Sequence, residues 1–203
     1  FGAQGVTIHP RPDQRHIRYQ DVYDLKQVVY TEYNIEGNPI PDFIDMVLKI
    51  KPTQVTLVPD VKDAITSSAG WDTIKHKGFL TDIIKEFKQN DIRTSVFLNP
   101  ILNQVEGAKA IGADRVELYT EAYAHDYSLG NREAIIPYSD CAELAMKLDI
   151  GLNAGHDLSL ENIQFFKQNL PGLLEVSIGH ALISESLYLG IDNVINMYLN
   201  KLK

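Results

Sequence analysis

The sequence predicts a (β/α)₈ barrel whose first strand lies outside the residues of this chain. Short β-branched runs alternate with longer amphipathic stretches from end to end, a pattern typical of parallel sheets built from β-α units. Within the runs, apolar and polar residues alternate. A sheet covered by helices on both faces has strands that are apolar throughout, so the alternation favours a closed barrel with a polar interior near its mouth.

Seven strands are expected, each bounded by turn-forming residues. In the first, Val6 and Ile8 share one face, while Thr7 and His9 share the other. The strands are expected at residues 5–9, 33–36, 54–58, 93–98, 115–119, 150–154 and 174–178.

Helices are expected between these strands. Gly112 follows one of them as a stop signal, and Ser159, followed closely by Glu161, is a start signal. The helices are expected at residues 20–29, 41–49, 81–89, 104–111, 139–148, 159–169 and 185–201.

The number of strands is one short of a barrel, which needs eight strands and about 250 residues. Residues 2–5 resemble the tail of a helix running into a strand. We therefore expect a first strand and most of its helix to be absent, together with any site residues that they carry. No linker or change of composition divides the chain, so residues 1–203 are expected to form a single barrel domain, incomplete at its N-terminus.

Charge and composition exclude several classes of function. The 203 residues include 19 Lys and Arg against 27 Asp and Glu, a net charge of −8, which disfavours binding to nucleic acid or to an anionic membrane surface. The apolar runs are too short to span a bilayer. Cys141 is alone, which favours a reducing compartment, and no signal peptide is evident. A soluble cytoplasmic protein is expected.

The first expected strand ends in a cluster of cations. Residues 9–16 read H-P-R-P-D-Q-R-H, with two histidines, two arginines and two stiffening prolines. This composition predicts a site for phosphate or carboxylate, with His9 placed for proton transfer. The alternative is a solvated loop with ion pairs to Asp13 and Asp21.

Two carboxylates are expected to point into the barrel. Burial raises the pKa of a carboxyl group toward the working range of a general base, so Glu36 is a candidate base. A salt bridge to Arg11 or Arg115 is the structural alternative. Glu117 is a second acid or base, or a group that orients a neighbouring base.

Gly-His pairs follow two later strands, at 155–156 and 179–180. Loops after the last two strands of a barrel commonly hold phosphate, with help from a helix N-terminus. The long polar loop 59–71 is either a lid that excludes water or an ordinary surface loop. No metal-ligand spacing supports a metal site, and no lysine at a strand end supports a Schiff base.

Several segments together resemble the pyridoxine 5′-phosphate synthase family. They are V-T-I-H-P-R-P-D-Q-R-H-I, N-I-E, I-T-S-S-A-G-W-D, V-E-L-Y-T, N-A-G-H-D-L and S-I-G-H-A-L-I, and they cover essentially the whole chain. The resemblance implies a (β/α)₈ barrel, usually a homo-octamer, without metal or organic cofactor. It implies a transferase of vitamin B6 biosynthesis. The expected reaction condenses 1-deoxy-D-xylulose 5-phosphate with 3-amino-2-oxopropyl phosphate to pyridoxine 5′-phosphate, phosphate and water.

The resemblance also implies roles for individual residues. His9 and Glu36 would be proton acceptors, and His156 would be a proton donor. Glu117 would stabilise the transition state. The ligands of the deoxyxylulose phosphate would be Arg11, His16 and Thr66, and those of the amino-ketone phosphate Asp157, Gly179 and His180.

The chain departs from common family forms at three places. Asp157 stands where Gly is frequent, so only its backbone is a plausible phosphate ligand. Residues 67–69 read Ser-Ser-Ala where Thr-Glu-Gly is common. The family's first strand, with its Asn-x-Asp-His element, is missing.

Two other functions compete with this one. A metal-dependent sugar isomerase or hydrolase barrel would use the same histidines and glutamates. A protein that only binds phosphate ligands would have no need of the acid–base set formed by His9, Glu36 and His156.

Overall fold

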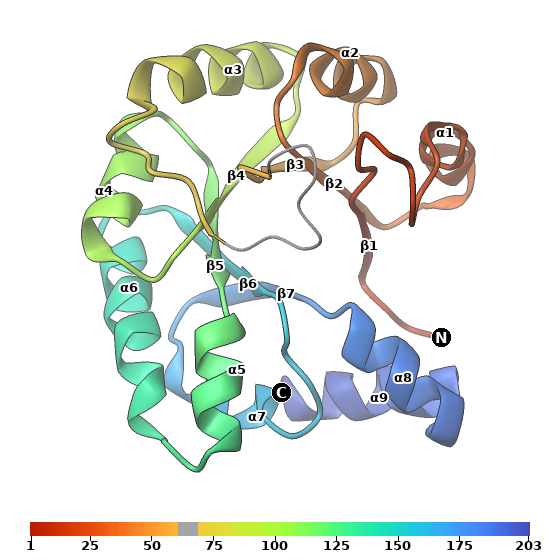
Figure 1. The fold of residues 1–203 in the computed structure, drawn as a ribbon, viewed down its shortest axis with the longest axis vertical. Helices are drawn as coiled ribbons and strands as arrows, with labels where there is room; N and C mark the ends of the chain where they lie inside the picture. The colour runs from red at the N-terminus through yellow and green to blue at the C-terminus, as the bar shows by residue number, and fades with distance from the viewer. Residues whose placement is uncertain (61–68) are drawn as a thin grey trace.

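In the part of the chain that the structure describes, seven strands form one parallel sheet that curls into a nearly closed ring. A computed structural model describes residues 1–60 and 69–203. Each strand is hydrogen-bonded to the next in chain order, from β1 to β7. Figure 1 shows the strands following one another around the ring with helices outside them. The predicted α/β barrel class is confirmed.

The elements alternate as expected. The strands are β1 (Gly5–Ile8), β2 (Glu32–Gly37), β3 (Gln54–Leu57), β4 (Arg93–Leu98), β5 (Arg115–Tyr119), β6 (Gly151–Gly155) and β7 (Leu173–Ser177). The helices are α1 (Tyr19–Val28), α2 (Pro41–Ile50), α3 (Lys77–Gln89), α4 (Leu102–Ala110), α5 (Glu121–Ser128), α6 (Ile136–Lys147), α7 (Ile163–Asn169), α8 (His180–Leu189) and α9 (Ile191–Lys201), with a 3₁₀ turn at Glu133–Ile135.

The alternation of side chains along the strands separates a dry layer from a polar interior. Residues on one face pack under the helices and are almost completely buried, among them Ile35, Val55, Val96, Val116 and Leu152. Their neighbours in sequence point into the ring. In-register pairing of parallel strands places those inward side chains in layers, which is how the interior of a barrel is filled.

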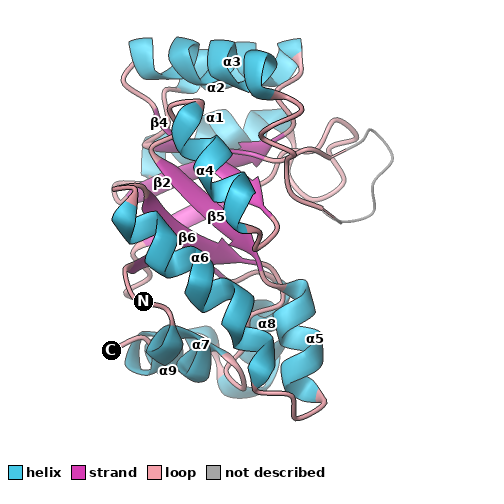
Figure 2. Ribbon diagram, turned by 90° about the vertical axis from the view of Figure 1, so that its left-hand side faces the viewer, coloured by secondary structure: helices cyan, strands magenta, loops and turns pink. Residues whose placement is uncertain are grey.

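The helices cover the outside of the ring by means of amphipathic faces. In α2, Pro41 at the first turn fixes a helical φ, and Phe43 and Val47 face the core. Lys51 ends this helix in the left-handed region, at φ 49°, and Gly112 follows α4 at φ 83°. Figure 2 shows α4 and α6 side by side across the strands.

Four helix predictions were wrong in their bounds, among them the expected helix 139–148, which begins at Ile136. The expected helix 185–201 is two helices, because Gly190 adopts φ 81° between α8 and α9. Helix α7 begins at Ile163 rather than at Ser159, since the Asn162 side chain accepts the Ser159 N–H at 2.9 Å and closes a turn first. Helix α3 begins four residues earlier than expected, at Lys77.

Helix α5 and the 3₁₀ turn were not predicted. Apolar residues do not recur at helical spacing in these segments. Tyr123 is the buried residue of α5. The Tyr123 ring lies 4.9 Å from the Phe166 ring, and its hydroxyl donates to the Asn162 carbonyl oxygen at 2.8 Å. Tertiary packing of aromatic rings, rather than local periodicity, holds this segment.

No helix in residues 1–60 or 69–203 is both long enough and apolar enough to cross a membrane.

Candidate active site

A cavity of about 830 Å³ lies along β1 and β7, which are not hydrogen-bonded to each other, and extends to the carboxyl ends of the strands. Barrel enzymes place their catalytic groups at this end. The structure brings nine of the ten predicted site residues to its walls: His9, Arg11, His16, Glu36, Glu117, His156, Asp157, Gly179 and His180. The tenth, Thr66, lies outside the described residues, as does most of the expected lid.

His9 follows β1 directly and lies between two carboxyl groups. Its Nδ1 is 3.8 Å from Glu36 Oε2, and its Nε2 is 3.4 Å from Asp60 Oδ2. Burial, with the nearby Arg11 charge, lowers the pKa of His9 to about 4, although Asp60 opposes the shift. His9 is therefore a neutral imidazole near neutral pH, the form that can accept a proton.

Arg11 turns inward and pairs with Asp60. Its Nη1 donates to Asp60 Oδ2 at 2.5 Å, and both side chains are almost buried. Further along the same loop, Arg15 pairs with the exposed Asp13 at 3.1 Å. The cation cluster is thus divided between His9, Arg11 and His16 at the cavity and Arg15, which forms a more exposed ion pair.

Glu36 lies at the mouth on β2, with 18% of its side chain exposed. Burial raises its pKa well above the ordinary value, and the neighbouring carboxylates of Glu117 and Asp60 add to the shift. Glu36 does not form the salt bridge to Arg11 or Arg115 that was the structural alternative, because Arg11 pairs with Asp60 and Arg115 pairs with Glu175. Glu36 therefore stays available to take up and release a proton.

Glu117 on β5 is nearly inaccessible, at 2% exposure. Burial, with the Glu175 carboxylate nearby, raises its pKa to about 7, while a contact with the Thr56 hydroxyl at 3.4 Å opposes the shift. The same hydroxyl lies 3.1 Å from Asn34 Oδ1, and the Asn34 amide donates to Thr7 Oγ1 at 3.3 Å. A chain of polar side chains thus fixes Glu117 beneath the mouth.

A layer of ion pairs fills the ring below these groups. Arg115 Nη1 lies 2.5 Å from Glu175 Oε1, and the Asn153 amide donates to Glu175 Oε2 at 2.9 Å. Arg93 pairs with Glu32 and lies 3.6 Å from Glu175. Pairing offsets the cost of placing these charges inside the barrel. Glu32 and Glu175 of this layer line the cavity, which continues past them to Gly5 and Leu173 at the amino ends of β1 and β7.

His156 and Asp157 form the turn after β6. Both have left-handed backbones, at φ 86° and 57°. The Asp157 carboxylate lies 2.7 Å from His156 Nδ1, and the ring of Tyr119 meets the imidazole edge-on at 4.8 Å. Thr120 donates to the carbonyl of Gly155 at 2.7 Å and to that of His156. These contacts hold the imidazole at the cavity wall.

Gly179 and His180 stand at the start of α8. Gly179 is the N-cap residue, and His180 is the first residue of the helix. The first N–H groups of a helix have no partner within it and attract anions. This side of the cavity therefore suits a phosphate group.

The sequence interpretation missed Asp60 and the ion-pair layer. Asp60 comes three residues after the end of β3, in a position that a search of strand ends would include. In the sequence, this layer is indicated only by charged residues at inward-pointing strand positions, namely Arg93, Arg115 and Glu175.

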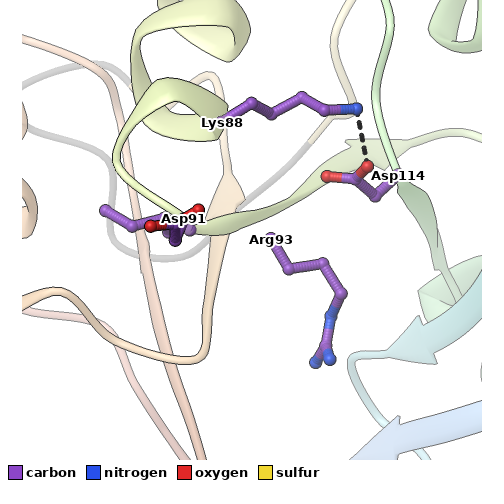
Figure 3. A pocket seen from close by; sticks show the side chains of 5 residues that line it. Lys88, Asp91, Arg93 and Asp114 are labelled. Atoms are coloured by element: carbon purple, nitrogen blue, oxygen red, sulfur yellow. Dashed lines mark hydrogen bonds and ion pairs between the residues drawn. The ribbon is translucent and has the colours of Figure 1, made fainter.

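A second hollow, of about 270 Å³, lies at the opposite ends of β4 and β5 (Figure 3). Lys88 Nζ donates a hydrogen bond to Asp114 Oδ1 in this hollow, at a distance of 2.7 Å. These two groups satisfy each other, and the hollow has no acid–base set. In the described ranges, no three His, Cys, Asp or Glu side chains gather as metal ligands.

Solved structures of similar fold support the architecture. The thiamine phosphate pyrophosphorylase from Pyrococcus furiosus matches with a TM-score of 0.64 at 10% identity, over 99% of this chain and 83% of that one. Monomers of phosphoribosylanthranilate isomerase from Thermotoga maritima match with a TM-score of 0.63 at 13% identity, over 99% and 88%. At these identities the likeness concerns the fold.

Relatives in sequence are much closer. A pyridoxine 5′-phosphate synthase from Flavobacterium johnsoniae is 70% identical, and one from Christiangramia forsetii is 60% identical. A third, from Bacteroides fragilis, is 57% identical. Each alignment covers 100% of this chain and 86% of the relative. The family model described as "Pyridoxal phosphate biosynthesis protein PdxJ" matches residues 1–203. The chain belongs to this family of pyridoxal phosphate biosynthesis proteins.

Proposed function

We propose that this chain is a pyridoxine 5′-phosphate synthase, a transferase of vitamin B6 biosynthesis. It condenses 1-deoxy-D-xylulose 5-phosphate with 3-amino-2-oxopropyl phosphate and releases phosphate and water. Family membership and the relatives' names support this assignment. The observation that carries it is the pair formed by His9 and Glu36, whose pKa values are shifted in opposite directions within one cavity.

Each proton transfer of the condensation has a suitable group. Imine formation, dehydration, phosphate elimination and ring closure move protons at neighbouring atoms, and acid–base groups serve such steps. His9 accepts a proton as the neutral imidazole. Glu36 accepts once the cationic amine or imine of a substrate favours its carboxylate form. His156 donates, and Glu117 stabilises positive charge that develops in the transition state.

The two phosphate groups bind at opposite sides of the cavity. Arg11 and His16, on the loop after β1, hold the phosphate of the deoxyxylulose, with Thr66 as a further ligand. The backbone of Asp157, with Gly179 and His180, holds the phosphate of the amino-ketone. Cationic side chains and helix N–H groups supply the local attraction that an acidic protein otherwise lacks.

The proposal extends to the state of the protein in the cell. Residues 1–203 form one barrel domain, the protein works in the cytoplasm, and it assembles as a homo-octamer. Size-exclusion chromatography with light scattering tests the assembly.

A direct assay tests the function against its competitors. The protein is incubated with both substrates, with and without EDTA, and pyridoxine 5′-phosphate is measured by its fluorescence after separation. We expect formation of the product, unchanged by the chelator. Loss of activity with EDTA would favour the metal-dependent barrel, and binding of both substrates without turnover would favour a pure binding protein.

A further inference from the structure

Asp60 contacts two residues of the cavity, His9 and Arg11, which lie on a different loop. Its Oδ2 accepts from Arg11 Nη1 at 2.5 Å and lies 3.4 Å from His9 Nε2. The Asp60 side chain is 8% exposed, although it follows β3 while the other two follow β1. A single oxygen atom therefore contacts both the arginine and the imidazole.

The chemistry of these three groups favours one of the two ring nitrogens of His9 as the site of its proton. A carboxylate only accepts hydrogen bonds, and a guanidinium only donates them. Nε2 is the ring nitrogen nearest to a carboxylate, 3.4 Å from Asp60 Oδ2, so the negative charge of Asp60 favours the neutral form that carries its proton on Nε2. The lone pair then lies on Nδ1, which is the nitrogen 3.8 Å from Glu36 Oε2.

The backbone holds Asp60 in place independently of its side chain. The Asn38 amide donates to the Asp60 carbonyl oxygen at 2.6 Å. Val58, two residues earlier, donates its N–H to the Gly37 carbonyl oxygen at 2.9 Å. Both partners lie at the end of β2 or just after it, so the end of β2 anchors the residue that orients His9.

We propose that Asp60 is a positioning residue, which holds the proton of His9 on Nε2 and leaves Nδ1 as the basic atom toward Glu36. A proton taken from the substrate bonds to Nδ1, and the electron pair of the broken bond stays on the substrate. The resulting imidazolium is balanced by the Asp60 carboxylate. The effect of Asp60 on turnover rests on the proposed function, whereas the effect of Asp60 on the protonation of the imidazole does not.

The charges around His9 are consistent with this role. Arg11, Arg15 and His16 lower the pKa of His9 together with burial, and Asp60 raises it. Among these neighbours Asp60 therefore favours the protonated imidazole that the reaction must form. The same carboxylate also orients Arg11, the proposed phosphate ligand.

The state of the imidazole is measured without substrate. Long-range ¹H–¹⁵N correlation spectra of the full ¹⁵N-labelled chain at pH 7.5 report which nitrogen of each of the six histidines carries the proton. The His9→Gln variant assigns the His9 signals. We expect the Nε2-protonated form in the unmodified protein and in Asp60→Asn, whose oxygen still accepts, and a mixture of the two forms in Asp60→Ala.

Kinetics test the consequence for turnover. We expect kcat to fall about 100-fold in Asp60→Ala, the scale of a misplaced general base, and about 10-fold in Asp60→Asn, which lacks the balancing charge. Loss of Arg11 orientation appears separately, in KM for the deoxyxylulose phosphate. The matched control is Asp13→Ala, which removes the exposed partner of Arg15 and is expected to keep kcat within twofold.

Each outcome decides the proposal. An unchanged Nε2-protonated His9 in Asp60→Ala would overturn it, as would a kcat equal to that of the Asp13→Ala control. If Asp60→Ala fails to fold, an Asp60→Asn variant with unaltered kcat overturns it instead. If the unmodified protein does not turn over these substrates, the proposed function fails, while the spectra still test the role of Asp60.

Discussion

Gly155 leaves the space that the Glu117 carboxyl group occupies. Gly155 on β6 pairs with Tyr119, two residues along β5 from Glu117, and a Cβ at position 155 would overlap Glu117 Oε1. The backbone at Gly155 has no unusual φ, so glycine is required here for space rather than for conformation. The position of a buried carboxyl group therefore depends on the smallest side chain of the next strand.

The Gly155→Ala substitution is expected to displace Glu117 and to lower kcat at least tenfold, since removal of one preorganised electrostatic group typically costs more than that. Steady-state kinetics on the two substrates measure this. Gly78→Ala is the matched control, because a Cβ there meets nothing within 4 Å. Equal kcat values in the two variants would contradict the link between Gly155 and Glu117.

Glu117 is expected to make stability depend on pH. Burial raises its pKa to about 7 in the folded protein, so the folded state keeps a proton that the unfolded chain releases above about pH 4.5. Its contribution to stability is therefore full below that pH and is lost as pH rises toward 7. Glu117→Gln should be more stable than the unmodified protein at pH 8, by about 3 kcal/mol at most, and should gain little at pH 4.5.

Urea unfolding at pH 4.5 and pH 8 measures this difference. Glu86→Gln, on the exposed face of α3, is the control and should show a similar small effect at both pH values. A Glu117→Gln variant whose stability relative to the unmodified protein does not change with pH would contradict the buried, protonated carboxyl group.

Glu36→Gln is expected to bind both phosphate substrates but to lose turnover about 100-fold or more, because the amide keeps the size of the side chain and cannot accept a proton as a base. Isothermal titration with each substrate alone gives the binding, and the product assay gives kcat. Turnover close to normal in Glu36→Gln would remove Glu36 as the base.

Asp157→Gly separates the backbone of residue 157 from its side chain. Glycine accepts φ 57° without strain, so the variant should fold with a stability within about 1 kcal/mol of the original. KM for the amino-ketone phosphate should stay within twofold, because the backbone binds it. The lost contact with His156 Nδ1 should lower kcat only about threefold, since the carboxylate is 46% exposed and such pairs are weak.

Steady-state kinetics with the amino-ketone phosphate as the varied substrate, together with thermal unfolding, check these values. A large rise in KM would show that the Asp157 side chain, rather than its backbone, contacts the substrate.

Local pattern predicted most of the fold. The alternation in β1 and β5 predicted both their positions and which side chains point inward, because the period of a strand is two residues whatever surrounds it. The break at Gly190 was missed, since a glycine within an apolar helical pattern is also tolerated in a continuous helix. Helix α5 was missed because its stability comes from ring contacts with residues more than 30 positions away.

The sequence by itself determined which residues stand at the carboxyl ends of parallel strands, and therefore that His9, Glu36, Glu117 and His156 belong to one end of the barrel. Only the tertiary structure decided how these groups act on one another. The partner of Arg11 proved to be Asp60, 49 positions along the chain, and not Glu36. The reason is physical: side-chain period is a local property, whereas burial, charge–charge distance and the pKa values that follow from them arise only when the strands curl into a ring.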